Sequence, residues 1–196
     1  MSTRYKLFFS SVFFVSPWFK TMQNARRISL QKYEIDGSDG ALIAQIEMPR
    51  GLWTANGAPL ADAISGAGFG ENPVLKIGEK TYEIHRDLLT DKLVVNRYSI
   101  YVKDDAGRKI IEATAPVEKR SSLICYNETE FLVTARSIFA FDYDVTSNDS
   151  NVARFKDVSP FLTFSSRRLY HIETEAREIE PLLLAFSFFL AVLIAY

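Results

Sequence analysis

The sequence predicts a single, mostly β domain that buries an apolar C-terminal helix. Two features support this: short apolar alternations fill residues 26–173, and an uninterrupted apolar run extends from Leu182 to Tyr196. A length of 196 residues suits one domain. The chain is 47% hydrophobic and 24% charged, so it can bury a core. Its 15 Phe and 9 Tyr favour pleated, half-buried surfaces.

Alternation of apolar and polar residues marks the strands. Turn residues interrupt it at intervals of roughly 8–12 positions, which is typical of an all-β barrel or sandwich. No window between residues 26 and 173 sustains a helical period, and about a dozen candidate strands can be counted. Three stretches alternate clearly, and each should place one apolar set on a single face: Leu42, Ala44, Ile46 and Met48; Tyr98, Ile100 and Val102; Phe139, Phe141, Tyr143 and Val145.

Three hairpins are predicted from turn residues. Asp36–Gly40 and Asp104–Gly107 place glycine where a positive φ is needed and aspartate where its side chain can bind the backbone, and residues 77–81 form a third candidate. The first two follow a shared unit, Tyr33-Glu34-Ile35 and Tyr98-Ser99-Ile100, which indicates a barrel built from repeated ribbons.

Two segments depart from this pattern. Residues 51–73 are rich in glycine and predict a loop insertion; their Gly66–Gly70 stretch lacks the following helix that a nucleotide-binding loop requires. Residues 1–25 are predicted to lie outside the 26–196 domain as an apolar strand or lead-in. Because Leu7–Val15 follows basic residues, an uncleaved anchor or a signal peptide is also open, although no small-x-small cleavage site follows.

The C-terminal run should be helical, near residues 181–196. Pro181 suits a first helical turn, and Glu178 and Glu180 lie where the helix dipole favours negative charge. Fifteen residues reach about 22 Å, short of the roughly 30 Å of bilayer hydrocarbon, and a closed barrel of about a dozen strands would supply an apolar wall. Small residues at Ser187, Ala191 and Ala195 fit close packing against strands or against another membrane helix. Membrane insertion therefore stays an alternative.

A family resemblance rests on the two Tyr-x-Ile…Asp…Gly hairpins, at 33–40 and 98–107, and on the C-terminal ending. That ending runs from Phe161 through Arg167 and Arg168, then an acidic link, to the apolar helix. The chain resembles the tubby C-terminal-like superfamily, which includes LURP-one-related proteins and phospholipid scramblases, and is especially similar to uncharacterised bacterial members. The resemblance implies a closed antiparallel barrel of twelve strands around the hydrophobic C-terminal helix. It also implies phosphoinositide binding by basic side chains in tubby domains. Scramblases carry a cysteine-rich segment, whereas this chain has only Cys125.

Composition and motifs exclude several classes of function. A formal net charge of −1 provides no global attraction for nucleic acid, so no nucleic-acid partner is expected. One cysteine implies no oxidising compartment, and cytoplasmic placement, in part at a membrane surface, is expected. His85 and His171 lack ligand spacing, and the aspartates near Asp142 lack the glycine and glutamate of a calcium loop. No nucleophile motif is present, so we expect no metal, no cofactor and no catalytic residues.

Basic pairs are the remaining candidates for a site. Arg167 with Arg168, Arg26 with Arg27, and Lys119 with Arg120 could hold a phosphate if the fold groups them. The leading hypothesis is a non-enzymatic β-barrel module that binds lipid headgroups or docks at a membrane surface. Two alternatives are a tail-anchored membrane protein that inserts the segment from Leu182 to Tyr196, and a structural domain that binds a protein partner.

Overall fold

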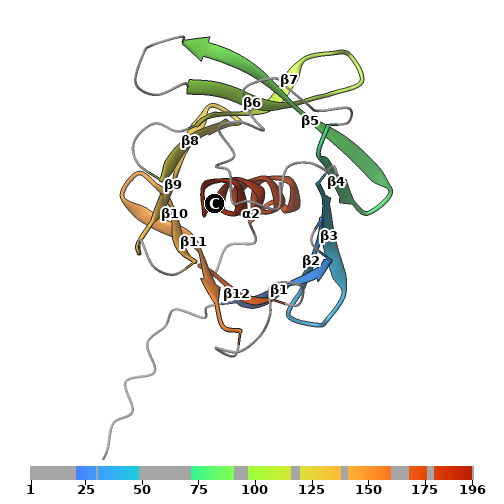
Figure 1. The fold of residues 1–196 in the computed structure, drawn as a ribbon, viewed down its shortest axis with the longest axis vertical. Coiled ribbons are helices and arrows are strands. Elements are labelled where there is room, and N and C mark those ends of the chain that lie inside the picture. The colour runs from blue at the N-terminus through green and yellow to red at the C-terminus, as the bar shows by residue number, and fades with distance from the viewer. Residues whose placement is uncertain are drawn as a thin grey trace, which may run out of the picture.

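The fold is a closed antiparallel β-barrel around a single helix (Figure 1). The computed structural model describes residues 21–29, 31–48, 72–90, 97–115, 120–137, 141–159, 168–175 and 179–195. Each strand pairs with its neighbours in the chain, and β1 closes the barrel against β12, with Thr21 opposite Thr174. The predicted fold class is confirmed: the described strands number twelve, and the apolar helix is C-terminal.

The elements follow one another in chain order around the barrel. Their bounds are β1 (Thr21–Ser29), β2 (Lys32–Asp36), β3 (Leu42–Glu47), β4 (Val74–Ile77), β5 (Lys80–Thr90), β6 (Arg97–Lys103), β7 (Lys109–Ala115), β8 (Ser121–Tyr126), β9 (Thr129–Ala135), β10 (Asp142–Ser147), β11 (Ser150–Asp157), β12 (Leu169–Thr174) and α2 (Pro181–Ala195).

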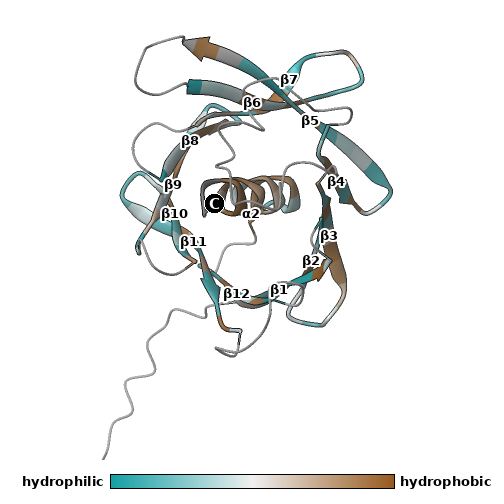
Figure 2. Ribbon diagram, in the orientation of Figure 1, coloured by the Kyte–Doolittle hydropathy of each residue, from teal (hydrophilic) through white to brown (hydrophobic). Residues whose placement is uncertain are grey.

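The helix α2 fills the barrel. Figure 2 shows hydrophobic residues along the helix and its central position within the ring of strands. From Leu182 to Leu193 its side chains are at most 8% exposed. Phe188 is fully buried, with its ring centroid 5.9 Å from that of Tyr33, 5.4 Å from that of Phe155 and 5.4 Å from that of Tyr170. A helix that is apolar on all sides must be shielded from water, and here the apolar inward faces of the strands surround it.

A membrane-spanning helix was the competing expectation for this segment. Within the described residues, no helix combines the length and the apolar character needed to cross a membrane.

The predicted strand faces agree with the structure at most positions. Ala44, Ile46 and Met48 point inward and are at most 5% exposed, but Leu42 is 52% exposed. A register shift pairs Leu42, the first residue of β3, with Asp36, the last residue of β2. This irregularity at the strand end accounts for the exposure of Leu42. On β6, Ser99 and Tyr101 face outward yet are buried, because side chains of neighbouring strands cover them.

All three predicted hairpins are present. Gly40 and Gly107 have φ near 80°, and the Asp104 side chain accepts backbone hydrogen bonds from Ala106 and Arg108. Two further hairpins, at residues 127–128 and 148–149, were not predicted from the sequence. Both place two non-glycine residues at positive φ, a conformation in which asparagine and aspartate are tolerated better than most residues.

Several sequence predictions fall on residues that the structure does not describe. These are the apolar segment within residues 1–20, most of the loop insertion near 51–73, and the glycines of residues 66–70. The first described strand, β1, begins at Thr21, before the predicted domain boundary at residue 26.

Candidate functional site

The two ends of the barrel differ in charge. The hairpins that join β2 to β3, β4 to β5, β6 to β7, β8 to β9 and β10 to β11 lie at the end where α2 begins. Each exposes one acidic side chain: Asp39, Glu79, Asp105, Glu128 and Asp149. We call this end the acidic end. The amino terminus of α2, which carries a partial positive charge, points toward it.

Arginines collect at the opposite end, which we call the basic end. It contains the connections from β1 to β2, from β7 to β8, from β9 to β10 and from β11 to β12, and α2 runs toward it. Its described arginines are Arg26, Arg27, Arg97, Arg120, Arg136 and Arg168. The fold therefore brings Arg26, Arg27, Arg120 and Arg168, at least one member of each predicted basic pair, to the same end of the barrel.

Arg26 and Arg27 point to opposite sides of β1. Arg26 is exposed on the outer surface, with a nitrogen 3.0 Å from Glu34 and another 3.4 Å from Asp36. Arg27 is only 4% exposed; its guanidinium lies 5.6 Å from the ring centroid of Tyr33, and its Nε donates to the Ser29 carbonyl. Arg26 is thus available to an external ligand, whereas Arg27 belongs to the barrel wall.

Arg168 lies beside this position. The backbone N–H of Arg27 donates to the carbonyl of Arg168 over 2.8 Å, so Arg168 is adjacent to the predicted pair 26–27. The Arg168 guanidinium forms an ion pair with Asp157 at 3.0 Å. Arg120, from the third pair, donates to the Ser137 carbonyl on another side of the barrel. Arg167 and Lys119 lie outside the described residues.

Some carboxylates of the basic end are tightly held by arginine. Arg154 donates two hydrogen bonds, of 2.9 and 2.8 Å, to Asp142, and these bonds lower the pKa of the Asp142 carboxyl. Asp144 is 3.5 Å from Arg136. Asp142 and Asp144, the aspartates considered above for a calcium loop, thus contact arginines. Among the described residues, no group of side chains could hold a metal ion.

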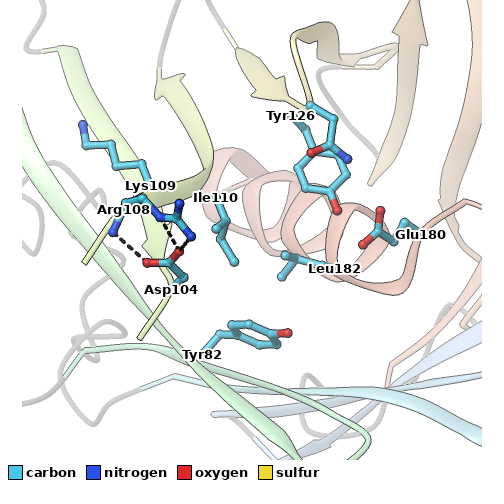
Figure 3. A pocket seen from close by; sticks show the side chains of 9 residues that line it. Tyr82, Asp104, Arg108, Lys109, Ile110, Tyr126, Glu180 and Leu182 are labelled. Atoms are coloured by element: carbon cyan, nitrogen blue, oxygen red, sulfur yellow. Dashed lines mark hydrogen bonds and ion pairs between the residues drawn. The ribbon is translucent and has the colours of Figure 1, made fainter. Parts of the chain in front are cut away.

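A cavity of about 610 Å³ opens at the acidic end, where α2 begins. Figure 3 shows its lining: Asp104, Arg108 and Lys109 on one side, Tyr126 and Glu180 on the other, and Tyr82, Ile110 and Leu182 between them. The residues come from β5, the turn between β6 and β7, the start of β7, the end of β8, the start of α2 and the residue before it. The site combines charged groups at its mouth with an apolar floor.

The polar groups of this cavity are already organised. The hydroxyl group of Tyr126 donates a hydrogen bond to Glu180. Burial, which is the main cause, and this hydrogen bond, which is the second, raise the pKa of Tyr126 to about 12, so the phenol stays protonated at neutral pH. Arg108 contacts Asp104 at 2.8 Å, and hydrogen bonds from the Arg108 backbone and side chain lower the pKa of Asp104. Leu184 N–H donates to the Glu180 carbonyl, which fixes Glu180 at the start of the helix.

A second polar cluster covers the outer face of β6 and β7. Ser99 donates to Glu112, and Lys109 Nζ lies 2.7 Å from Glu112 and 3.4 Å from Ser99. Burial alone would raise the pKa of Glu112, but the bonds from Lys109 and Ser99 outweigh it and lower the pKa. Although a serine beside a lysine could suggest a nucleophile, Ser99 is 1% exposed, so this cluster is a structural network.

The two histidines lie outside the cavity. His85 stacks on Tyr101 with ring centroids 5.6 Å apart, and its Nδ1 is 3.5 Å from the Asn72 amide. His171 lies on β12 opposite Asn24 and Lys156.

The cavity could not be predicted from the sequence. Its two tyrosines and Glu180 come from three distant segments, and none belongs to a motif. The one available indication was Glu180 directly before Pro181, which located the start of the helix but not the groups facing it. No protein-family model, curated protein or solved structure matches this chain.

Proposed function

We propose that the protein is a non-enzymatic β-barrel module that docks with its basic end on an anionic membrane surface. The observation that carries this proposal is the group of arginines at the basic end of the barrel, opposite an end where exposed carboxylates outnumber the exposed cations Lys80, Lys103, Arg108 and Lys109. A chain with a net charge of −1 can thereby present a basic surface locally. The resemblance to the tubby C-terminal-like superfamily supports the same function, since the tubby domains of that superfamily bind phosphoinositides through basic side chains.

Three arginines are the proposed headgroup contacts. The side chains of Arg26, Arg136 and Arg168 are 53%, 49% and 33% exposed. Each also has a carboxylate partner, so a lipid phosphate would share or replace that partner rather than meet an isolated cation. Binding should therefore be modest and should weaken with added salt.

Co-sedimentation with vesicles tests this directly. The protein should bind vesicles of phosphatidylcholine with phosphatidylglycerol more strongly than vesicles of phosphatidylcholine alone. One basic residue near an anionic surface contributes about 1 kcal/mol. Because the partners reduce this contribution, the variant R26Q/R136Q/R168Q should bind at least about tenfold more weakly than the native protein.

The matched control removes the same charge at the acidic end. The variant K80Q/K103Q/R108Q also loses three positive charges but should retain native binding within about twofold, since those residues face away from the membrane. Equal weakening by the two triple variants, or no binding of the native protein to anionic vesicles, would contradict the proposal.

A further inference from the structure

We propose that the cavity at the acidic end binds an organic cation that carries an apolar group. The cationic nitrogen would lie beside Glu180 and the rings of Tyr82 and Tyr126, and the apolar group against Ile110 and Leu182 (Figure 3). This site is at the opposite end of the barrel from the proposed membrane contact and does not depend on it.

The charges around the cavity select a cation. Arg108 is paired with Asp104, and the Lys109 ammonium is turned toward Glu112 and Ser99 on the outer face. The positive groups at the cavity are thus already compensated. Glu180 is exposed, its carboxylate accepts a hydrogen bond from the neutral Tyr126 phenol, and among the described residues it has no cationic partner. Among the described groups at the cavity, Glu180 is therefore the carboxylate left to a cationic ligand.

Aromatic rings complete the recognition of a cation. Tyr82 and Tyr126 both line the cavity, and aromatic faces attract quaternary ammonium groups through their quadrupole. Tyr126 is 8% exposed and Leu182 is 7% exposed, so the floor beneath the charged mouth is largely desolvated. A volume of about 610 Å³ accommodates a small organic molecule, since ligand pockets typically measure about 300–1,000 Å³.

The surrounding hairpins add a favourable field. The exposed carboxylates of this end, at the five hairpin tips and at Glu180, outnumber its exposed cations Lys80, Lys103, Arg108 and Lys109, so the balance of charge at this end is negative. Cations are concentrated in such a field, and anions are repelled, even when individual charges are several ångströms from the ligand.

Isothermal titration with three ligands that share one apolar tail tests the charge preference. Hexyltrimethylammonium should bind the full-length protein, hexanol should bind at least about fivefold more weakly, and hexyl sulfate should show no measurable binding. Equal or tighter binding of hexyl sulfate would overturn the proposal, as would the absence of hexyltrimethylammonium binding.

Single substitutions locate the site. Glu180→Gln should weaken hexyltrimethylammonium binding by about fivefold, the upper range for a partly exposed ion pair, and Tyr82→Leu should weaken it several-fold while leaving hexanol binding unchanged. Asp149→Asn is the matched control, because it removes a carboxylate from the same end at a positive-φ position that asparagine accepts. Thermal unfolding confirms that each variant is folded. Equal weakening by Glu180→Gln and Asp149→Asn would reduce the effect to general electrostatics and overturn the assigned site.

Discussion

Replacing Phe188 with alanine should lower the free energy of unfolding by about 3–5 kcal/mol, as for other large aromatic residues in a core. Phe188 is fully buried, and its ring contacts those of Tyr33, Phe141, Phe155 and Tyr170. These rings come from separate strands and from a residue preceding β10, so the truncation would leave a cavity between the helix and one side of the barrel. Urea denaturation followed by circular dichroism measures the loss.

Leu42→Ala provides the control for this substitution. Leu42 is 52% exposed at the end of β3, so its truncation should change the free energy of unfolding by less than about 0.5 kcal/mol. A Phe188→Ala variant as stable as Leu42→Ala would show that α2 is not packed in the barrel.

Introducing a carboxylate at Leu190 should unfold the protein at neutral pH. Leu190 is 0% exposed on α2, so an aspartate there would be buried in the apolar interior. An unpaired buried charge costs several kcal/mol, in addition to the lost apolar packing, and this is comparable to the whole stability of a domain of about 5–15 kcal/mol. Size-exclusion chromatography and near-ultraviolet circular dichroism of Leu190→Asp should show loss of the native state.

The same substitution at an exposed leucine separates burial from chemistry. Leu42→Asp introduces the identical charge on a side chain that is half exposed, so this variant should stay folded. If Leu190→Asp retained a native unfolding transition at neutral pH, the interior position of the helix would be contradicted.

Much of the fold could be predicted because its signals are local. Alternation in stretches such as Tyr98–Val102 identifies a strand within a few residues. Gly40 and Gly107 indicate turns because glycine readily adopts the positive φ that these turns require. The apolar helix then requires an enclosing wall, which favours a closed barrel over an open sheet. The exposure of Leu42 was not predicted, because the register shift at this position depends on the pairing of β3 with β2. The alternation pattern within β3 alone contains no sign of that shift.

The candidate sites were harder to predict because they depend on contacts between residues that are far apart in the sequence. The basic pairs were visible in the sequence, but Arg27 is buried against Tyr33 while Arg26 is exposed, and alternation along a strand of unknown register could not decide which. The carboxylate partner of Arg168 comes from β11. For the cavity, the proximity of Tyr126 to Glu180 depends on where α2 enters the barrel, and no spacing in the sequence encodes that position.

Thiol counting tests the central claim, that α2 is the core of the barrel. Cys125 is exposed and is the chain's single cysteine, so it serves as an internal reference. Ser187 is 0% exposed in the middle of α2, and cysteine is close to it in size. In Ser187→Cys, a thiol reagent should modify only Cys125 in the folded protein without detergent, and both thiols after unfolding in guanidinium chloride. Prompt modification of both thiols in the folded protein would contradict the account.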